Sequence, residues 1–201
     1  MNYNHKQRLA FTSRPLFFKR IKMQTEYIKS NELFADKGFE SLYQFCKKPI
    51  LVADQLRNPE NAGALIRLAD NIGAAEMLFI GDSSAMRMIR LKRAAASSVG
   101  NIPWSFVSDD AIIQHIPAGY TKIGIETTRD ALNLFTTELP DNVVFFAGNE
   151  GKGMRDELIS QMDYCVYIPV PGPTRSLNVT HAVAVVVFEW LRQKMLKFNV
   201  K

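Results

Sequence analysis

Cysteine is scarce in this sequence: Cys46 and Cys165 stand alone, with no ligand-like spacing of other residues around them. Two isolated cysteines form neither a disulfide framework nor a recognisable metal motif. We therefore expect no bound metal, and a reducing, cytoplasmic environment. Long apolar runs are also missing, since none approaches the roughly 18 residues that a membrane-spanning helix needs. We expect no membrane partner.

Acidic residues are absent from the first 22 positions, which carry six basic ones: Lys6, Arg8, Arg14, Lys19, Arg20 and Lys22. The whole chain has a net charge of +5, so the remaining 19 basic and 20 acidic residues make residues 23–201 nearly neutral. The basic segment lacks the apolar core and cleavage site of a secretory signal. We expect residues 1–22 to be a disordered leader, either an RNA-contacting arm or an extension upstream of a start at Met23.

The segment 143–154, which reads VVFFAGNEGKGM, lacks both common nucleotide-binding fingerprints despite its glycines. A P-loop ends in Gly-Lys-Ser/Thr, but Gly153 is followed by Met154 and Arg155. The dinucleotide fingerprint Gly-x-Gly-x-x-Gly has the opposite glycine spacing. The apolar run predicts a buried strand, and the glycines predict a turn at its carboxyl end, where open α/β sheets bind ligands. On its own, the segment is more simply interpreted as a strand and a flexible turn.

The length suits one domain with a short appendage. Residues 23–48 predict one or two short helices, too little for an independent domain, and residues 49–201 form the main domain. Its predicted strands are 50–53, 77–80, 104–107, 120–125, 143–147 and 164–168. Its predicted helices run from Asn58-Pro59 to just before Gly73, and over about 86–96, 109–116, 156–162 and 178–194. This alternation implies an α/β fold, with a mostly parallel sheet and helices on both faces.

Two further segments combine helix-capping signals with polar side chains. Residues 58–67 read NPENAGALIR, a helix start whose amides and arginine would also suit a phosphate. Residues 168–180 read IPVPGPTRSLNVT, a proline-stiffened loop in which Ser176 or Asn178 could cap the next helix. Each segment alone is more simply interpreted as capping.

Together and in this order, the three segments resemble the SpoU (TrmH-like) family of SPOUT methyltransferases. The family motifs are Asn-x-Gly-x-x-x-Arg, Gly-x-Glu-Gly-x-Gly, and Ile-Pro followed by Ser-Leu-Asn-Val before an apolar helix. Residues 96–100, ASSVG, also look like the family segment between the first two motifs. The resemblance covers roughly residues 50–195.

The resemblance implies transfer of a methyl group from S-adenosylmethionine to a ribose 2′-hydroxyl of tRNA or rRNA. It also implies a deep trefoil knot in the carboxyl-terminal third, and a homodimer in which the site is completed across the interface. Neither the RNA nor the nucleotide is named by the sequence. Many family members carry a separate RNA-binding domain before the catalytic one, whereas only about 48 residues precede it here.

Site residues follow from matching this chain to the family motifs. The resemblance implies that the cofactor is bound by Gly148, Gly151, Ile168 and Leu177. It implies that the polar active-site positions are Asn61, Arg67, Glu150, Ser176 and Asn178. Because a guanidinium stays protonated, Arg67 is a poor base, and we expect it to clamp an RNA phosphate and orient the hydroxyl.

RNA contact must come from local patches, because the main domain is nearly neutral. Four cations fall within seven residues that contain no acid: Arg87, Arg90, Lys92 and Arg93. A solvated helix face is the equally simple interpretation.

The same residues fit other functions to different degrees. A catalytically silent RNA-binding protein with the SPOUT fold is the main alternative, although the polar motif positions are intact. A serine hydrolase built on Ser176 and His181 lacks the Gly-x-Ser-x-Gly elbow. A base-methylating relative has no support, because the Ser-Leu-Asn motif belongs to the ribose-methylating group.

Overall fold

The computed structural model of the chain describes residues 27–35 and 38–200. The basic leader 1–22 lies outside the described residues. The chain divides into two compact units, Met1–Asp36 and Lys37–Lys201. Of the first unit the structure describes one short helix, α1 (Ser30–Phe34). The sheet and the remaining helices belong to the second unit.

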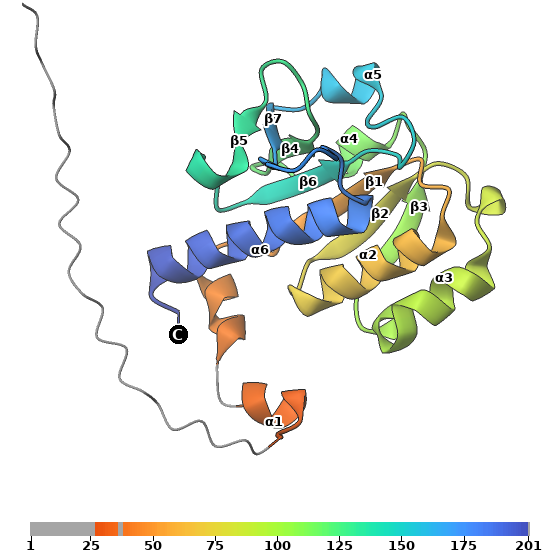
Figure 1. Ribbon diagram of the computed structural model, residues 1–201. Helices are drawn as coiled ribbons and strands as arrows, with labels where there is room; N and C mark the ends of the chain where they lie inside the picture. The colour runs from red at the N-terminus through yellow and green to blue at the C-terminus, as the bar shows by residue number, and fades with distance from the viewer. Residues whose placement is uncertain (1–26, 36–37, 201) are drawn as a thin grey trace, which may run out of the picture. The chain divides into compact units, whose positions relative to one another are not determined.

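Seven parallel strands form one sheet, in the order β3-β2-β1-β6-β4-β7-β5 (Figure 1). Their bounds are β1 Ile50–Asp54, β2 Glu76–Ile80, β3 Trp104–Val107, β4 Thr121–Ile125, β5 Leu132–Asn133, β6 Val143–Ala147 and β7 Tyr164–Tyr167. Six of these strands match the predicted ones. The additional strand, β5, has only two residues and therefore shows no alternation that a sequence pattern could reveal.

The helices of this unit are α2 (Pro59–Asn71), α3 (Met88–Ala95), α4 (Ile112–His115), α5 (Asp156–Ile159) and α6 (Val179–Phe198). Short 3-10 helices are η1 (Phe39–Gln44), η2 (Ser83–Ala85), η3 (Ala96–Gly100) and η4 (Leu134–Thr136). Helices α4 and α5 are shorter than predicted, and α6 continues past the predicted end. Helix α2 begins as predicted, because the Asn58 side chain accepts hydrogen bonds from the N–H groups of Glu60 and Asn61.

Helices cover both faces of the sheet, which confirms the predicted architecture. Side chains alternate along a strand, so β1 contributes Leu51 to one face and Val52 to the other. Leu51 packs in the cluster that contains α2 and α6. Val52 packs in the cluster that contains Ile112 of α4 and Leu158 of α5. Figure 1 shows α2 and α6 on one side of the sheet, with α3 outside α2.

The wholly buried strand β6 lies between β1 and β4, at the centre of the sheet. From β1 the chain moves outward to β2 and β3, and it then returns to β4 on the other side of β6. The carboxyl end of β6 therefore lies where the strand order reverses, the usual ligand position in open α/β sheets. The glycine loop begins at this point.

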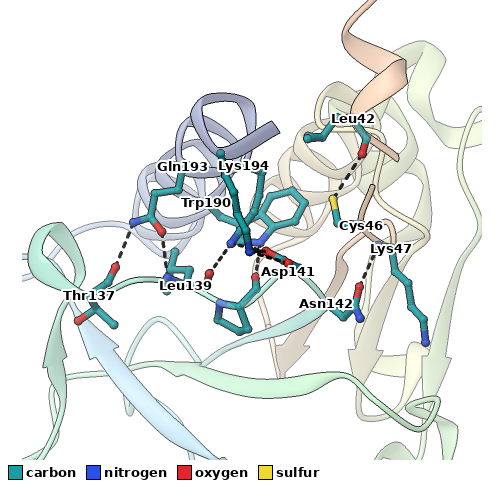
Figure 2. A network of polar contacts seen from close by, with 12 residues as sticks. Leu42, Cys46, Lys47, Thr137, Leu139, Asp141, Asn142, Trp190, Gln193 and Lys194 are labelled. Carbon is teal, nitrogen blue, oxygen red and sulfur yellow. Dashed lines mark hydrogen bonds and ion pairs between the residues drawn. The ribbon is translucent and has the colours of Figure 1, made fainter. Parts of the chain in front are cut away.

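The carboxyl half of α6 is tied to the segment that leads into β6 (Figure 2). Gln193 donates to the Thr137 carbonyl over 3.0 Å and accepts from the Leu139 N–H over 2.9 Å. Lys194, only 1% exposed, donates to Asp141 over 2.9 Å. These contacts fix α6 against the strand whose other end carries the glycine loop.

None of the helices in the described ranges has the length and apolar character needed to span a membrane. Within the same residues, no three His, Cys, Asp or Glu side chains gather in a way that could hold a metal ion.

Candidate functional site

A cavity of about 260 Å³ lies at the carboxyl edge of the sheet. Three segments surround it: the end of β4, the glycine loop, and the chain from β7 into α6. All four predicted cofactor positions line it, namely Gly148, Gly151, Ile168 and Leu177. Its lining also includes apolar side chains from the neighbouring strands and loops: Ile125, Val166, Val170 and Val179. The cavity thus offers both apolar surface and glycine backbone to a ligand.

Three polar positions, one from each motif, meet beside this cavity. Asn61 donates from Nδ2 to Oε1 of Glu150 over 2.9 Å. Asn178 donates from Nδ2 to Oδ1 of Asn61 over 3.3 Å. Asn178 is itself held as the cap of α6, because its Oδ1 accepts from the Thr180 N–H over 2.9 Å. Motifs that are distant in sequence are therefore joined by direct hydrogen bonds.

The other two predicted active-site residues are placed differently. Ser176 is exposed and lines the cavity. Arg67 is exposed on α2, six residues beyond Asn61, which puts it about 9 Å further along the helix and on another side of it. No hydrogen bond or ion pair of Arg67 occurs in the described part of the chain. A single chain therefore does not bring Arg67 to the Asn61–Glu150 contact.

The glycine loop closes on itself through Gly148 and Gly153. Asn149 and Gly153 exchange backbone hydrogen bonds of 2.9 and 3.0 Å. A Cβ on Gly148 would lie 2.2 Å from the carbonyl carbon of Gly153, and Gly153 has a φ of +72°. Both glycines are therefore required by the loop itself. At Gly151, by contrast, a Cβ would meet only Asn149 Oδ1, at 3.5 Å.

Glu126, which the sequence analysis missed, holds the loop from the end of β4. Its carboxylate accepts from the Met154 N–H over 2.8 Å and from the Thr127 N–H over 2.9 Å. It also lines the cavity. Its position directly after a predicted strand is the only signal that could have revealed it.

A second anchor that the sequence analysis missed lies where the glycine loop ends, at Arg155. Its guanidinium donates to the buried Asp54 over 2.7 Å and to Asp109 over 2.8 Å. The hydrogen bond to Asp54 makes the largest contribution, and the one to Asp109 the next, to raising the pKa of Arg155 above its ordinary value. The arginine ties the loop to the carboxyl end of β1. The sequence signal that could have revealed this anchor is Asp54, an acid directly after the apolar run 50–53.

The predicted basic patch lies on α3 and at its start, and its four members are all exposed: Arg87, Arg90, Lys92 and Arg93. Only Arg90 has an ion pair among the described residues, 3.7 Å from Glu60 on α2. The patch is held near the site by close helix packing. A Cβ on Gly63 would lie 2.4 Å from the Leu91 carbonyl oxygen, so this motif glycine lets α3 approach α2.

The segment 96–100 also has a structural role. Buried Ser98 donates from its hydroxyl to Asp70 of α2 over 2.7 Å, and Asn101 donates to the same carboxylate over 3.0 Å. These contacts fasten the end of α3 to α2.

Residues 48–188 match the model of the SpoU rRNA Methylase family. The chain belongs to this family. The family assignment made from the three motifs is therefore confirmed. The all-parallel α/β sheet with its helices is consistent with the knotted SPOUT structures. The predicted fold class is therefore confirmed.

The chain is also similar to proteins of named activity and to solved structures. The chain is 32% identical over 151 residues to the tRNA (guanosine(18)-2′-O)-methyltransferase TARBP1 of Mus musculus. This match covers 73% of this chain and 10% of the mouse protein. It is 30% identical over 172 residues to the 23S rRNA (guanosine-2′-O-)-methyltransferase RlmB of Acinetobacter baylyi, covering 84% of this chain and 69% of the relative. The chain thus spans a small part of one relative and about two thirds of the other.

A solved structure, the AdoMet-bound rRNA methyltransferase from Sinorhizobium meliloti, is similar with a TM-score of 0.65 and 28% identity. The match covers 73% of this chain and 57% of that one. The cavity described above fits the same cofactor. It combines apolar side chains for an adenine ring with glycine backbone that a ligand can approach.

Proposed function

We propose that the protein transfers a methyl group from S-adenosylmethionine to a ribose 2′-hydroxyl of tRNA or rRNA. The observation that carries this proposal is the hydrogen-bonded series Glu150–Asn61–Asn178 beside a cavity lined by Glu150, Ser176 and the four predicted cofactor positions. Membership of the SpoU family and the activities for which its relatives are named support it.

The chain's own residues would mainly position the reactants. Bound S-adenosylmethionine supplies a methyl group on a sulfonium, so the protein need not provide an electrophile. Gly148, Gly151, Ile168 and Leu177 would hold the cofactor in the cavity. The amides of Asn61 and Asn178 and the hydroxyl of Ser176 can orient the attacking hydroxyl by neutral hydrogen bonds.

Arg67 enters this proposal through a homodimer. In one chain it lies away from the Asn61–Glu150 contact, so we propose that it reaches the cavity of the partner subunit and clamps an RNA phosphate there. Exposed apolar side chains of α6 support an interface on this helix. Phe188 is 49% exposed and Leu196 is 66% exposed, and their spacing puts them on the same side.

The α3 patch would contact the RNA backbone outside the cavity, since four exposed cations can neutralise phosphates. The proposed division of the chain into leader, appendage (23–48) and catalytic domain (49–201) leaves this patch in the catalytic domain. Leu42 and Cys46 of the appendage are buried in the core of the second unit.

A cytoplasmic location stays a prediction.

The experiment that tests the function uses purified protein, S-adenosylmethionine with a labelled methyl group, and total RNA from cells that lack the gene. We expect label on the 2′-oxygen at a defined nucleotide, found by mapping ribose methylation with and without the protein. Label on bases would overturn the ribose assignment. RNA that binds without being labelled would instead support the catalytically silent alternative.

A further inference from the structure

A second cavity, of about 500 Å³, lies against the carboxyl end of β1. The glycine-loop segment 149–153 contributes to the lining of both cavities, and Glu150 borders each of them. The remaining lining is almost entirely polar: Asp54, Gln55, Arg57 and Arg155. These residues supply three charged groups and one amide to a ligand.

Two cations in this lining are available to a ligand. Arg155 is already paired with Asp54 and Asp109. Arg57 and Lys152, in contrast, are both exposed, and in the described ranges they have neither a hydrogen bond nor an ion pair. Because Glu150 is the only lining acid outside the Arg155 pair, the second cavity carries a net positive charge.

The backbone beneath these cations is held in a set shape. Gln55 has a φ of +46°, in the left-handed region that non-glycine residues rarely adopt. Its N–H donates to the Ile80 carbonyl over 3.0 Å, and its carbonyl accepts from Nδ2 of Asn149 over 2.6 Å. Such strain persists only where surrounding contacts impose it, and it is found preferentially at ligand sites. Arg57 follows two residues later.

We propose that the second cavity binds a phosphate of the substrate RNA, next to the methylated ribose, through Arg57 and Lys152. The proposal rests on the proposed methyl transfer. Because Glu150 borders both cavities, a nucleotide whose ribose reaches the first would present an adjacent phosphodiester to the second. Arginine and lysine are the side chains that bind phosphates most directly.

The test compares the double variant Arg57→Gln/Lys152→Gln with a matched control, Lys47→Gln/Lys48→Gln. The control removes two exposed cations from the segment before β1, at the opposite end of the strand. RNA binding is measured by filter binding across a range of KCl concentrations, with total RNA from cells lacking the gene. Binding of S-adenosylmethionine is measured by calorimetry. We expect the test variant to lower the salt-dependence slope of RNA binding by about 1, because the two cations together neutralise one phosphate.

The same variant should bind S-adenosylmethionine with unchanged affinity and raise the KM for RNA, with turnover at saturating RNA preserved. An unchanged slope, or an equal change in the control, would overturn the proposal. Lost affinity for S-adenosylmethionine would also overturn it, because the cations would then serve the cofactor's carboxylate. If the unaltered protein binds RNA but never methylates it, the proposed function fails, while the slopes still decide whether these cations contact phosphate.

Discussion

Asn61 donates a hydrogen bond to Glu150 over 2.9 Å although 89 residues separate them. The amide oxygen of Asn61 also accepts from Asn178, so both ends of the amide are used. An acceptor that carries a charge makes the first bond the stronger of the two. The contact therefore sets the distance between the start of α2 and the glycine loop.

Exchanging donor and acceptor tests this contact. Asn61→Asp puts a second carboxylate against Glu150, and we predict that kcat falls about tenfold or more, since a hydrogen bond to a charged group contributes roughly 1.5–3 kcal/mol. Adding Glu150→Gln restores one donor and one acceptor, so the double variant should recover part of the loss. Rates of methyl transfer in the single and double variants are the measurement. No recovery at all would show that the charge of Glu150 acts in itself.

Gly151 separates loop geometry from ligand binding. Gly151→Ala meets only an ordinary contact, so the free energy of unfolding should change by less than about 0.5 kcal/mol. The affinity for S-adenosylmethionine should nevertheless fall, because the new methyl group lines the cavity. Gly148→Ala should impair both, since its Cβ overlaps Gly153. Urea unfolding and calorimetry measure the two effects. Unaltered cofactor affinity in Gly151→Ala would remove Gly151 from the binding site.

Local signals in the sequence were enough to place the elements that carry the site. Asn58 and the following proline predicted the start of α2, and the apolar run before Gly148 predicted β6. The contacts Arg155–Asp54 and Met154–Glu126 were missed because they join residues 101 and 28 positions apart and belong to no local pattern. Strand order at the carboxyl edge, which only the fold determines, brings them together.

Gly63 is expected to control the packing of α3 on α2. In Gly63→Ala the new Cβ would lie 2.6 Å from the Cβ of Ala94, as well as against the Leu91 carbonyl. We predict a loss of roughly 1–3 kcal/mol in the free energy of unfolding, measured in urea, because overpacking forces the helices apart. Gly100→Ala is the matched control, since nothing lies within 4 Å of its Cβ position. Equal effects in both variants would contradict the packing role.

Asp141 should make stability depend on acid pH. Burial alone would raise its pKa, but hydrogen bonds from Lys197 and Lys194 outweigh burial and lower the pKa below its ordinary value. A lowered carboxyl pKa contributes stability above the unfolded value of about 4, and this contribution is lost as pH falls through the folded pKa.

Asp141→Asn should therefore be less stable than the unaltered protein at neutral pH, because buried Lys194 loses its counter-charge (Figure 2). Its free energy of unfolding should also fall less steeply as pH drops below about 4. Urea unfolding at a series of pH values measures both. Parallel pH profiles would contradict the assignment to Asp141.

Arg67 provides the test of the proposed dimer. The sequence motif identifies this arginine, but the turn of α2 takes it away from Asn61 in the same chain. If it acts on the partner subunit, Arg67→Ala and Glu150→Ala should each be nearly inactive alone. Mixed in equal amounts and allowed to exchange subunits, they should recover about a quarter of the normal activity, because half the dimers then hold one complete site. Arg67→Lys in place of Arg67→Ala keeps the charge but loses the two-pronged phosphate contact, so it should also be impaired. Failure of the mixture to recover activity, with mixed dimers demonstrated by differential tags, would place Arg67 in its own subunit's site.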